Sequence, residues 1–187
     1  YQKKRKELQA NEILTPSPHR IEPLEDHFVS CSPWQIMTLD HEHALKKEHA
    51  LKTFAPYKEV IELLQKTEVY SNQQRTSYRH KMEYHIYTDE DHRFHLGIFG
   101  RMEKKKIPIT PCVLATPAIN KAMTDIIRWL DTVQFPRSDL KTVILRSNRA
   151  GEVIAGLYTK TKNVELLTST LPFNFLSIFY SEPKSPA

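Results

Sequence analysis

The sequence predicts an α+β domain with a mainly antiparallel sheet and a few flanking helices. Residues 81–87 and 93–98 alternate apolar and polar side chains with a period of two, as half-buried strands do. Residues 116–130 carry apolar side chains at helical spacing, and further strand-like segments follow residue 140. Helices, a hairpin, a helix and then strands form the element order of an α+β fold. The chain has no glycine-rich nucleotide-binding turn, so we expect no Rossmann domain in it.

Three helices are predicted from apolar spacing and from their first residues. Residues 38–54 form a polar segment with a poor apolar stripe, which is typical of a surface helix. Pro56 suits the first position of a second helix, which should end near Thr67. Thr116 can cap a helix and Pro117 suits its first position, so the third helix has the clearest start.

The remaining strands are predicted from short apolar runs between turn residues. The polar run 88–92 connects the first two strands as a hairpin loop. A second hairpin is predicted from residues 141–147 and 152–158. Each of its two strands carries apolar side chains on both faces, which indicates central strands of the sheet. Residues 164–167 and 173–180 are interpreted as two more strands. Before the helices, residues 7–14 are predicted as a short strand and 21–35 as irregular.

Composition limits the class of protein. The chain has 187 residues, 40% of them hydrophobic, so it can bury a core in one domain or in two small ones. It has no apolar run near the roughly 20 residues that a membrane helix needs. Its two cysteines are too few for a disulfide scaffold and favour the reducing cytoplasm. A net charge of +5 weakly favours an anionic partner over an ordinary basic surface.

The first hairpin carries cations at both ends, and this favours RNA as a ligand. RNA binding needs cations for phosphates and flat groups on which unstacked bases can lie. The alternative is the solvated polar face of a sheet. The candidate RNA-binding residues are Tyr78, Arg79, Lys81, Arg101, Lys104, Lys105 and Lys106.

The cysteines, Cys31 and Cys112, leave several interpretations open. A structural zinc or iron–sulfur site usually uses four cysteine or histidine ligands, and this chain has no C-x-x-C pair. His27 and Cys31 form one loose pair of possible metal ligands. Nucleophilic catalysis by Cys31 would need a base beside the thiol, and His27 could serve as that base. Two ordinary buried thiols explain the pattern most simply.

Several segments resemble one family. The stretches SYRHKMEY, LGIFGRMEKKKIPITPC and TPAINKAM, together with the earlier PSPHRIEP and CSPWQIMTLDHEHALKKE, are similar to the RNA uracil-5-methyltransferases. Enzymes of this family use S-adenosylmethionine to methylate uridine in tRNA or rRNA. Tyr78, Arg79 and Lys81 match the tyrosine-arginine-x-lysine strand of the family, although His80 stands where asparagine is usual.

The resemblance implies a domain organisation. Residues 1–18 would be the tail of a TRAM-like barrel and a linker, 19–182 a central RNA-binding domain, and 183–187 a linker. The methyl donor and the catalytic cysteine would belong to a carboxy-terminal domain that lies outside this chain. The chain would then have no catalytic residue, bind no cofactor and methylate nothing alone. Its partners would be RNA, either tRNA or rRNA, and its own missing domains, with no membrane.

Many members of the family hold a [4Fe–4S] cluster on four cysteines. In this sequence the four positions fall on Glu25, Cys31, Trp34 and Cys112. Only two thiolates remain, so the resemblance implies no normally ligated cluster. We expect Trp34 to fill the space and Cys31 to lie near Cys112.

Two alternative functions remain open. The domain could be a scaffold whose sheet docks other protein domains and contacts little RNA. The parent could also be a member of the family that has lost catalysis, in agreement with its lost cluster ligands.

Overall fold

The computed structural model describes residues 12–101, 105–109, 111–133, 135–169, 175–182 and 184. The chain forms two compact units, one of residues 1–23 and 34–69 and one of residues 24–33 and 70–187. Among the described residues, no helix has both the length and the apolar character to span a membrane. The range 19–182, which was predicted as one central domain, includes residues of both units. The assignment of residues 1–18 to a barrel and of 183–187 to a linker stays a prediction.

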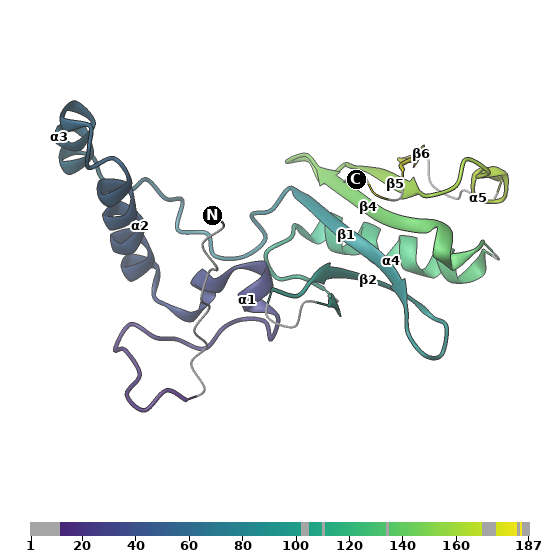
Figure 1. The fold of residues 1–187 in the computed structure, drawn as a ribbon, viewed down its shortest axis with the longest axis horizontal. Helices are drawn as coiled ribbons and strands as arrows, with labels where there is room; N and C mark the ends of the chain where they lie inside the picture. The colour runs from purple at the N-terminus through teal and green to yellow at the C-terminus, as the bar shows by residue number, and fades with distance from the viewer. Residues whose placement is uncertain are drawn as a thin grey trace, which may run out of the picture. The chain divides into compact units, whose positions relative to one another are not determined.

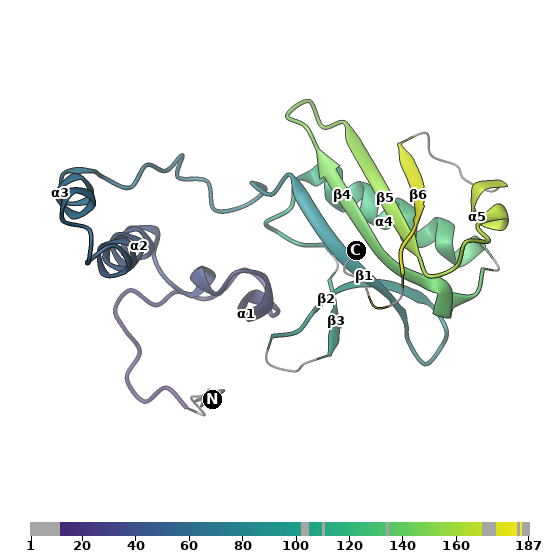
Figure 2. The same ribbon diagram turned by 45° about the horizontal axis from the view of Figure 1, so that its top comes forward.

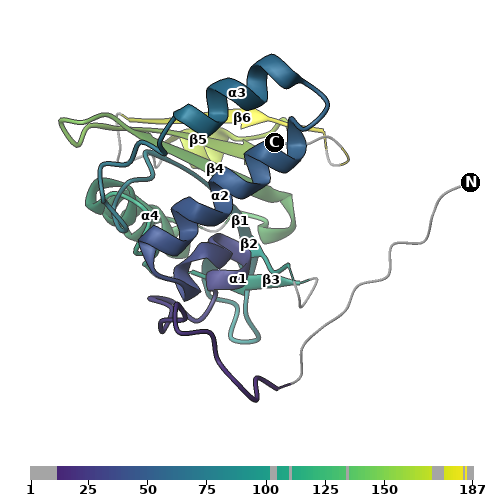
Figure 3. The same cartoon turned by 90° about the vertical axis from the view of Figure 1, so that its left-hand side faces the viewer.

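The first unit is built on two helices joined by a short turn, α2 (Leu39–Thr53) and α3 (Lys58–Lys66) (Figure 3). Helix α2 has no well-defined apolar face and no buried residue, and Glu–Lys pairs one turn apart, Glu42–Lys46 and Glu48–Lys52, stabilise it. The Lys47 ammonium donates a hydrogen bond to the Gln65 carbonyl of α3. Both predicted helices are present, although α3 begins at Lys58 and not at Pro56, which was predicted as its first residue.

The second unit contains a six-stranded sheet with the order β3-β2-β1-β4-β5-β6 (Figures 1 and 2). Neighbouring strands are antiparallel, except that β5 and β6 run parallel. This confirms the predicted α+β class with a mainly antiparallel sheet. The strands are β1 (Lys81–Thr88), β2 (Phe94–Phe99), β3 (Lys106–Pro108), β4 (Leu140–Ser147), β5 (Val153–Thr159) and β6 (Leu176–Tyr180).

Helix α4 (Pro117–Thr132) covers one face of this sheet and lies against β2, β4 and β5 (Figure 1). Thr116 caps it by accepting a hydrogen bond from the Ile119 amide, and Pro117 occupies its first turn, as predicted. Its buried face meets alternate residues of the strands, among them Tyr84, Leu145 and Leu157. The core of the unit therefore lies between α4 and one face of the sheet, which leaves the other face of the sheet without a helix among the described residues.

Polar side chains close the two predicted hairpins. Asp89 accepts a hydrogen bond from the Arg93 amide across the first loop. In the second loop Asn148 accepts from the Glu152 amide, and Gly151 takes a φ of 83°, a conformation that favours glycine. The two hairpins are confirmed, and β4 is central because it pairs with both β1 and β5.

Three predicted segments differ from the structure. Residues 164–167 were predicted as a strand, but α5 (Glu165–Ser169) is helical, because a four-residue segment with three apolar side chains does not distinguish the two states. The segment 21–35 was predicted as irregular and contains α1 (Phe28–Cys31) and part of η1 (Pro33–Ile36), while a third short helix, η2 (Arg137–Asp139), precedes β4. Residues 12–14 of the strand predicted at 7–14 have no strand structure, and residues 7–11 lie outside the described part.

Substitution of Gly97 should destabilise the sheet. A Cβ atom at this position of β2 would overlap the Ile107 backbone carbonyl of β3. We expect Gly97→Ala to lower the free energy of unfolding by about 1–3 kcal/mol, measured by urea denaturation. Gly156→Ala on β5 is the control, since its Cβ would meet only ring atoms of Phe179 and Tyr158 at 3.2 and 3.3 Å. An equal loss in both variants would contradict this account of the close approach of β3.

Candidate functional site

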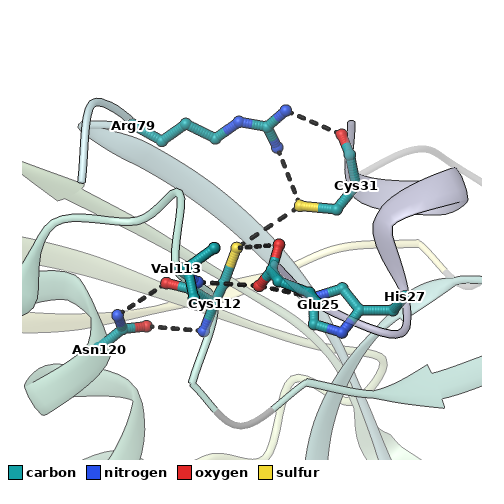
Figure 4. Close-up of polar contacts among 7 residues, drawn as sticks. All are labelled: Glu25, His27, Cys31, Arg79, Cys112, Val113 and Asn120. Carbon is teal, nitrogen blue, oxygen red and sulfur yellow. Dashed lines mark hydrogen bonds and ion pairs between the residues drawn. The ribbon is translucent and has the colours of Figure 1, made fainter. Parts of the chain in front are cut away.

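Four side chains with metal-binding atoms converge inside the second unit (Figure 4). Glu25, His27, Cys31 and Cys112 each contribute one such atom, and all four atoms lie within 4.8 Å of one another. Three of the residues come from the segment around α1, and Cys112 comes from the loop before α4. We call these four residues the 25–112 cluster.

Helix α4 holds the Cys112 end of this cluster. The Asn120 side chain accepts a hydrogen bond from the Cys112 amide at 3.2 Å and donates one to the Cys112 carbonyl at 2.9 Å. The next amide, that of Val113, donates to the Glu25 carboxylate at 2.8 Å. Asn120 of α4 and Glu25 of the segment around α1 thus hold the backbone of residues 112 and 113 in place.

The Cys31 end of the cluster is held by Arg79. The guanidinium donates to the Cys31 carbonyl at 2.8 Å and lies 3.5 Å from the Cys31 Sγ (Figure 4). Arg79 is itself fixed, because its amide donates to the Leu114 carbonyl and its carbonyl accepts from the Thr116 amide. The arginine therefore joins the start of β1 to α1 and to the loop that carries Cys112.

The two thiols are in direct contact, with 3.5 Å between their sulfur atoms. The hydrogen bond between the two thiols lowers the pKa of Cys112 and raises the pKa of Cys31. Interaction with the Cys112 sulfur also raises the pKa of His27, and the charge of Glu25 adds to this increase. The cluster thus favours a thiolate at Cys112 next to a cationic imidazole.

The structure confirms part of what the sequence predicts for these residues. Cys31 lies against Cys112, and Glu25, which occupies the first cysteine position of the family, lies in the same cluster. Trp34, which was expected to fill the space, is not among the four groups of the cluster; within the first unit its ring lies 6.3 Å from that of His49 and under the Lys46 ammonium. His27 supplies it instead, although the loose pair with Cys31 was its only signal in the sequence.

The predicted RNA-binding residues do not form a single group. Arg79 is directed at Cys31, whereas Tyr78 is 40% exposed and lines a surface pocket of about 840 Å³. Lys81 is exposed at the start of β1, and Lys106 donates to the Ile86 carbonyl. Arg101 and Lys105 are exposed, and Lys104 lies outside the described residues. The pocket residues are Asn72, Gln74, Ser77, Tyr78, His80, Ser147, Asn148 and Arg149.

The uncovered face of the sheet adds residues that the sequence did not single out. Register places Arg146 of β4 directly opposite Lys81, so both side chains project from the same face. On this face Tyr158 and Phe179 stack with ring centroids 5.4 Å apart, and Tyr87 stacks on His95 at 5.5 Å. Strand register was needed to find this group, since its members lie on five segments that are distant in sequence.

Loss of the Asn120 side chain should destabilise the fold around Cys112. Asn120→Ala leaves the Cys112 amide and carbonyl without these partners, so we expect the free energy of unfolding to fall by about 1–3 kcal/mol in urea. Lys121→Ala, at the next and exposed position of α4, is the control and should change it by less than about 0.5 kcal/mol. Equal stability of Asn120→Ala and the unmodified chain would contradict this role.

Comparison with a solved structure agrees with the fold described above. The chain matches the crystal structure of Pyrococcus abyssi tRNA (uracil-54, C5)-methyltransferase in complex with S-adenosyl-L-homocysteine at a TM-score of 0.62 and 17% identity. The match covers 94% of this chain and 40% of the archaeal chain, so this chain spans about two fifths of that protein. At 17% sequence identity, this similarity shows that the two chains share a fold.

Sequence comparison shows the family. No curated protein matches the sequence. The family described as tRNA (Uracil-5-)-methyltransferase matches residues 38–168, which is well over half of the chain. The protein therefore belongs to the tRNA (uracil-5-)-methyltransferase family.

Proposed function

We propose that this chain is the central, RNA-binding part of an RNA uracil-5-methyltransferase. In this proposal the uncovered face of the sheet holds tRNA, and residues outside this chain carry out the methyl transfer. Support comes from the family match and from a solved structure of which this chain spans 40%. That structure holds S-adenosyl-L-homocysteine, the product left when S-adenosylmethionine gives up its methyl group, so S-adenosylmethionine is the methyl donor we propose for the parent protein.

The observation that carries the proposal is a pair of like charges on neighbouring strands. Lys81 and Arg146 are directly opposite each other in the β1–β4 ladder, and like charges in this position destabilise a sheet. Neither side chain forms an ion pair with any residue that the structure describes. An anionic ligand that neutralises both cations would remove this repulsion, and RNA phosphate is such a ligand.

Other groups on the same face extend the cationic region. Burial and the charge of Lys160 lower the pKa of Lys106, and burial together with the charge of Lys106 lowers the pKa of His85. Beyond burial, these decreases reflect the positive charges of Lys160 and Lys106, while Glu83 on β1 acts in the opposite direction on His85. A surface of this kind attracts a polyanion over a distance before any specific contact forms.

Aromatic rings lie among these cations, as a surface for unpaired bases requires. Phe179 is 47% exposed and stacks on Tyr158, and β5 and β6 present both rings on the uncovered face. A base that stacks on such a ring gains about 1–3 kcal/mol without sequence preference. Cations and rings on one face therefore fit a single-stranded or loop region of tRNA better than a duplex.

A second candidate function is supported by apolar exposure on the same face. Ile154 is 66% exposed beside Phe179, and the two line a hollow of about 370 Å³. Exposed apolar side chains of this kind suit a protein domain as well as a base. In this case the face would dock another domain of the parent, and its binding to RNA would show little dependence on salt.

Removal of the like-charged pair tests the proposal. We expect Lys81→Ala with Arg146→Ala to weaken tRNA binding and to reduce the slope of log affinity against log salt by about 0.7–0.9 for each phosphate that the variant no longer neutralises. Binding is measured by fluorescence anisotropy across a salt series. Lys121→Ala with Arg128→Ala removes the same charge from the outer face of α4, where the side chains are 78% and 77% exposed.

The control pair separates a local contact from net charge. If this pair reduces affinity and slope as much as the first, only the total charge matters and the uncovered face is not the RNA surface. Absence of tRNA binding at low salt would favour the docking function. Arg79 is unsuitable for this test, because its loss would also remove its hydrogen bonds with Cys31.

A further inference from the structure

We propose that the 25–112 cluster binds one zinc ion, with Glu25, His27, Cys31 and Cys112 as its four ligands. The ion would have a structural role and would join the segment around α1 to the loop before α4. This inference does not depend on RNA binding, since the cluster shares no ligand with the uncovered face of the sheet.

The separations of the four ligand atoms fit a single tetrahedral ion. Zinc binds nitrogen and oxygen at about 2.0 Å and sulfur at about 2.3 Å, which places tetrahedral ligand atoms about 3.3–3.8 Å apart. The two sulfur atoms are 3.5 Å apart. The Glu25 Oε1 lies 3.8 Å from the Cys112 Sγ, and the Glu25 Oε2 lies 3.0 Å from the His27 Nε2, so one carboxylate oxygen must turn toward the ion. Occupation by zinc therefore needs only small shifts of these side chains.

The chemistry of the donors favours zinc over the other common ions. Two thiolates and an imidazole are the ligands of structural zinc sites, and a carboxylate oxygen is also accepted. Calcium and magnesium take six or more oxygen ligands and bind thiolates poorly, so this set excludes them. A closed set of four protein ligands leaves no position for water or substrate, which is the arrangement of a structural site.

Charge balance also favours a dication. With both thiols and the carboxylate ionised, the cluster carries three negative charges, and Zn²⁺ reduces this to one. The Arg79 guanidinium, which contacts the Cys31 carbonyl and sulfur, supplies the remaining positive charge. The occupied site is then neutral as a whole, as a buried site must be to avoid a large desolvation cost.

Two buried polar atoms near the cluster have no hydrogen-bond partner among the described residues, and they point to a ligand. The His27 Nε2 is within 3.0 Å of Glu25, but the geometry does not make a hydrogen bond. The Tyr84 hydroxyl is fully buried and unpaired, and burial and the charges of Cys112 and Cys31 raise its pKa. A zinc ion would give the imidazole nitrogen a partner, and buried polar atoms without one are rare.

Hydrogen bonds from neighbouring residues hold three of the four proposed ligands, as they do in other metal sites. The Val113 amide occupies the Glu25 Oε2, while Oε1 is directed at the Cys112 sulfur. Asn120 fixes the backbone of Cys112 from α4, and Arg79 fixes that of Cys31. Contacts of this kind orient the ligands before the ion arrives, and their loss usually weakens metal affinity about 10- to 100-fold.

The cluster does not fit the four-iron group that the family resemblance implies. A [4Fe–4S] cluster is held by four thiolates, one on each iron, and this site has two. All four ligand atoms also lie within 4.8 Å, a spacing suited to one ion rather than to four irons with bridging sulfides. The same place in the fold would therefore hold a different metal on a different set of ligands.

Metal analysis of the 187-residue chain tests the proposal. The chain is purified with a reductant, stripped with a chelator, and titrated with Zn²⁺ and then with Co²⁺ as a visible probe. We expect one zinc per chain, a rise in melting temperature with Zn²⁺, and the absorption of tetrahedral cobalt with thiolate ligands. Glu25→Gln and His27→Gln each keep the side-chain volume close to the original and should weaken zinc binding at least tenfold.

Two further variants keep the test decisive if a ligand variant fails to fold. Asn120→Ala leaves all four ligands in place and should weaken zinc binding about 10- to 100-fold. His92→Asn, in the exposed loop between β1 and β2, should leave zinc binding unchanged, and asparagine tolerates the positive φ of 63° there. The proposal is overturned if Zn²⁺ changes neither metal content nor melting temperature, or if the chain contains about four irons before it is stripped.

Discussion

Packing of α4 on one face of the sheet is the constraint on which the rest of the structure depends. This helix buries its apolar stripe against Tyr84, Leu145 and Leu157, so the alternate residues of the same strands must project from the opposite face. Its first turns also carry Asn120, which fixes the loop that contains Cys112. One helix therefore determines both which sheet face stays open and where the Cys112 end of the 25–112 cluster lies.

The short segment before β1 connects these two features. Arg79 directs its guanidinium to Cys31, while its neighbours Tyr78 and Lys81 are exposed to solvent. The ladder then continues from Lys81 to Arg146, so the cationic end of the open face begins two residues from the arginine that contacts the cluster. A metal ion that orders the segment around α1 would in this way also order the entry of β1 and the position of its exposed cations. In this account the cluster contacts no RNA itself, and it contributes to RNA binding only because it orders the entry of β1.

Local patterns in the sequence predicted the elements that depend on local physics. The period-two alternation before and after residues 88–92 was sufficient for β1 and β2, and Thr116 with Pro117 was sufficient for the start of α4. The prediction of a strand at 164–167 was wrong because so short a segment, with three apolar residues, fits a strand and a helix turn equally well. Cys31 and Cys112 were placed together only through the family resemblance. His27 had only its loose pair with Cys31 as a signal and Arg146 had none, since the role of each depends on a partner more than sixty residues away.

The central claim is that tRNA lies on the uncovered face of the sheet, and photocrosslinking tests it most directly. tRNA containing 4-thiouridine is bound to the chain, irradiated, and the crosslinked residues are identified by mass spectrometry. The account predicts crosslinks to the aromatic residues of this face, Tyr87, Tyr158 and Phe179, which decrease as salt is added. Crosslinks confined to the outer face of α4, or to the first unit alone, would contradict it.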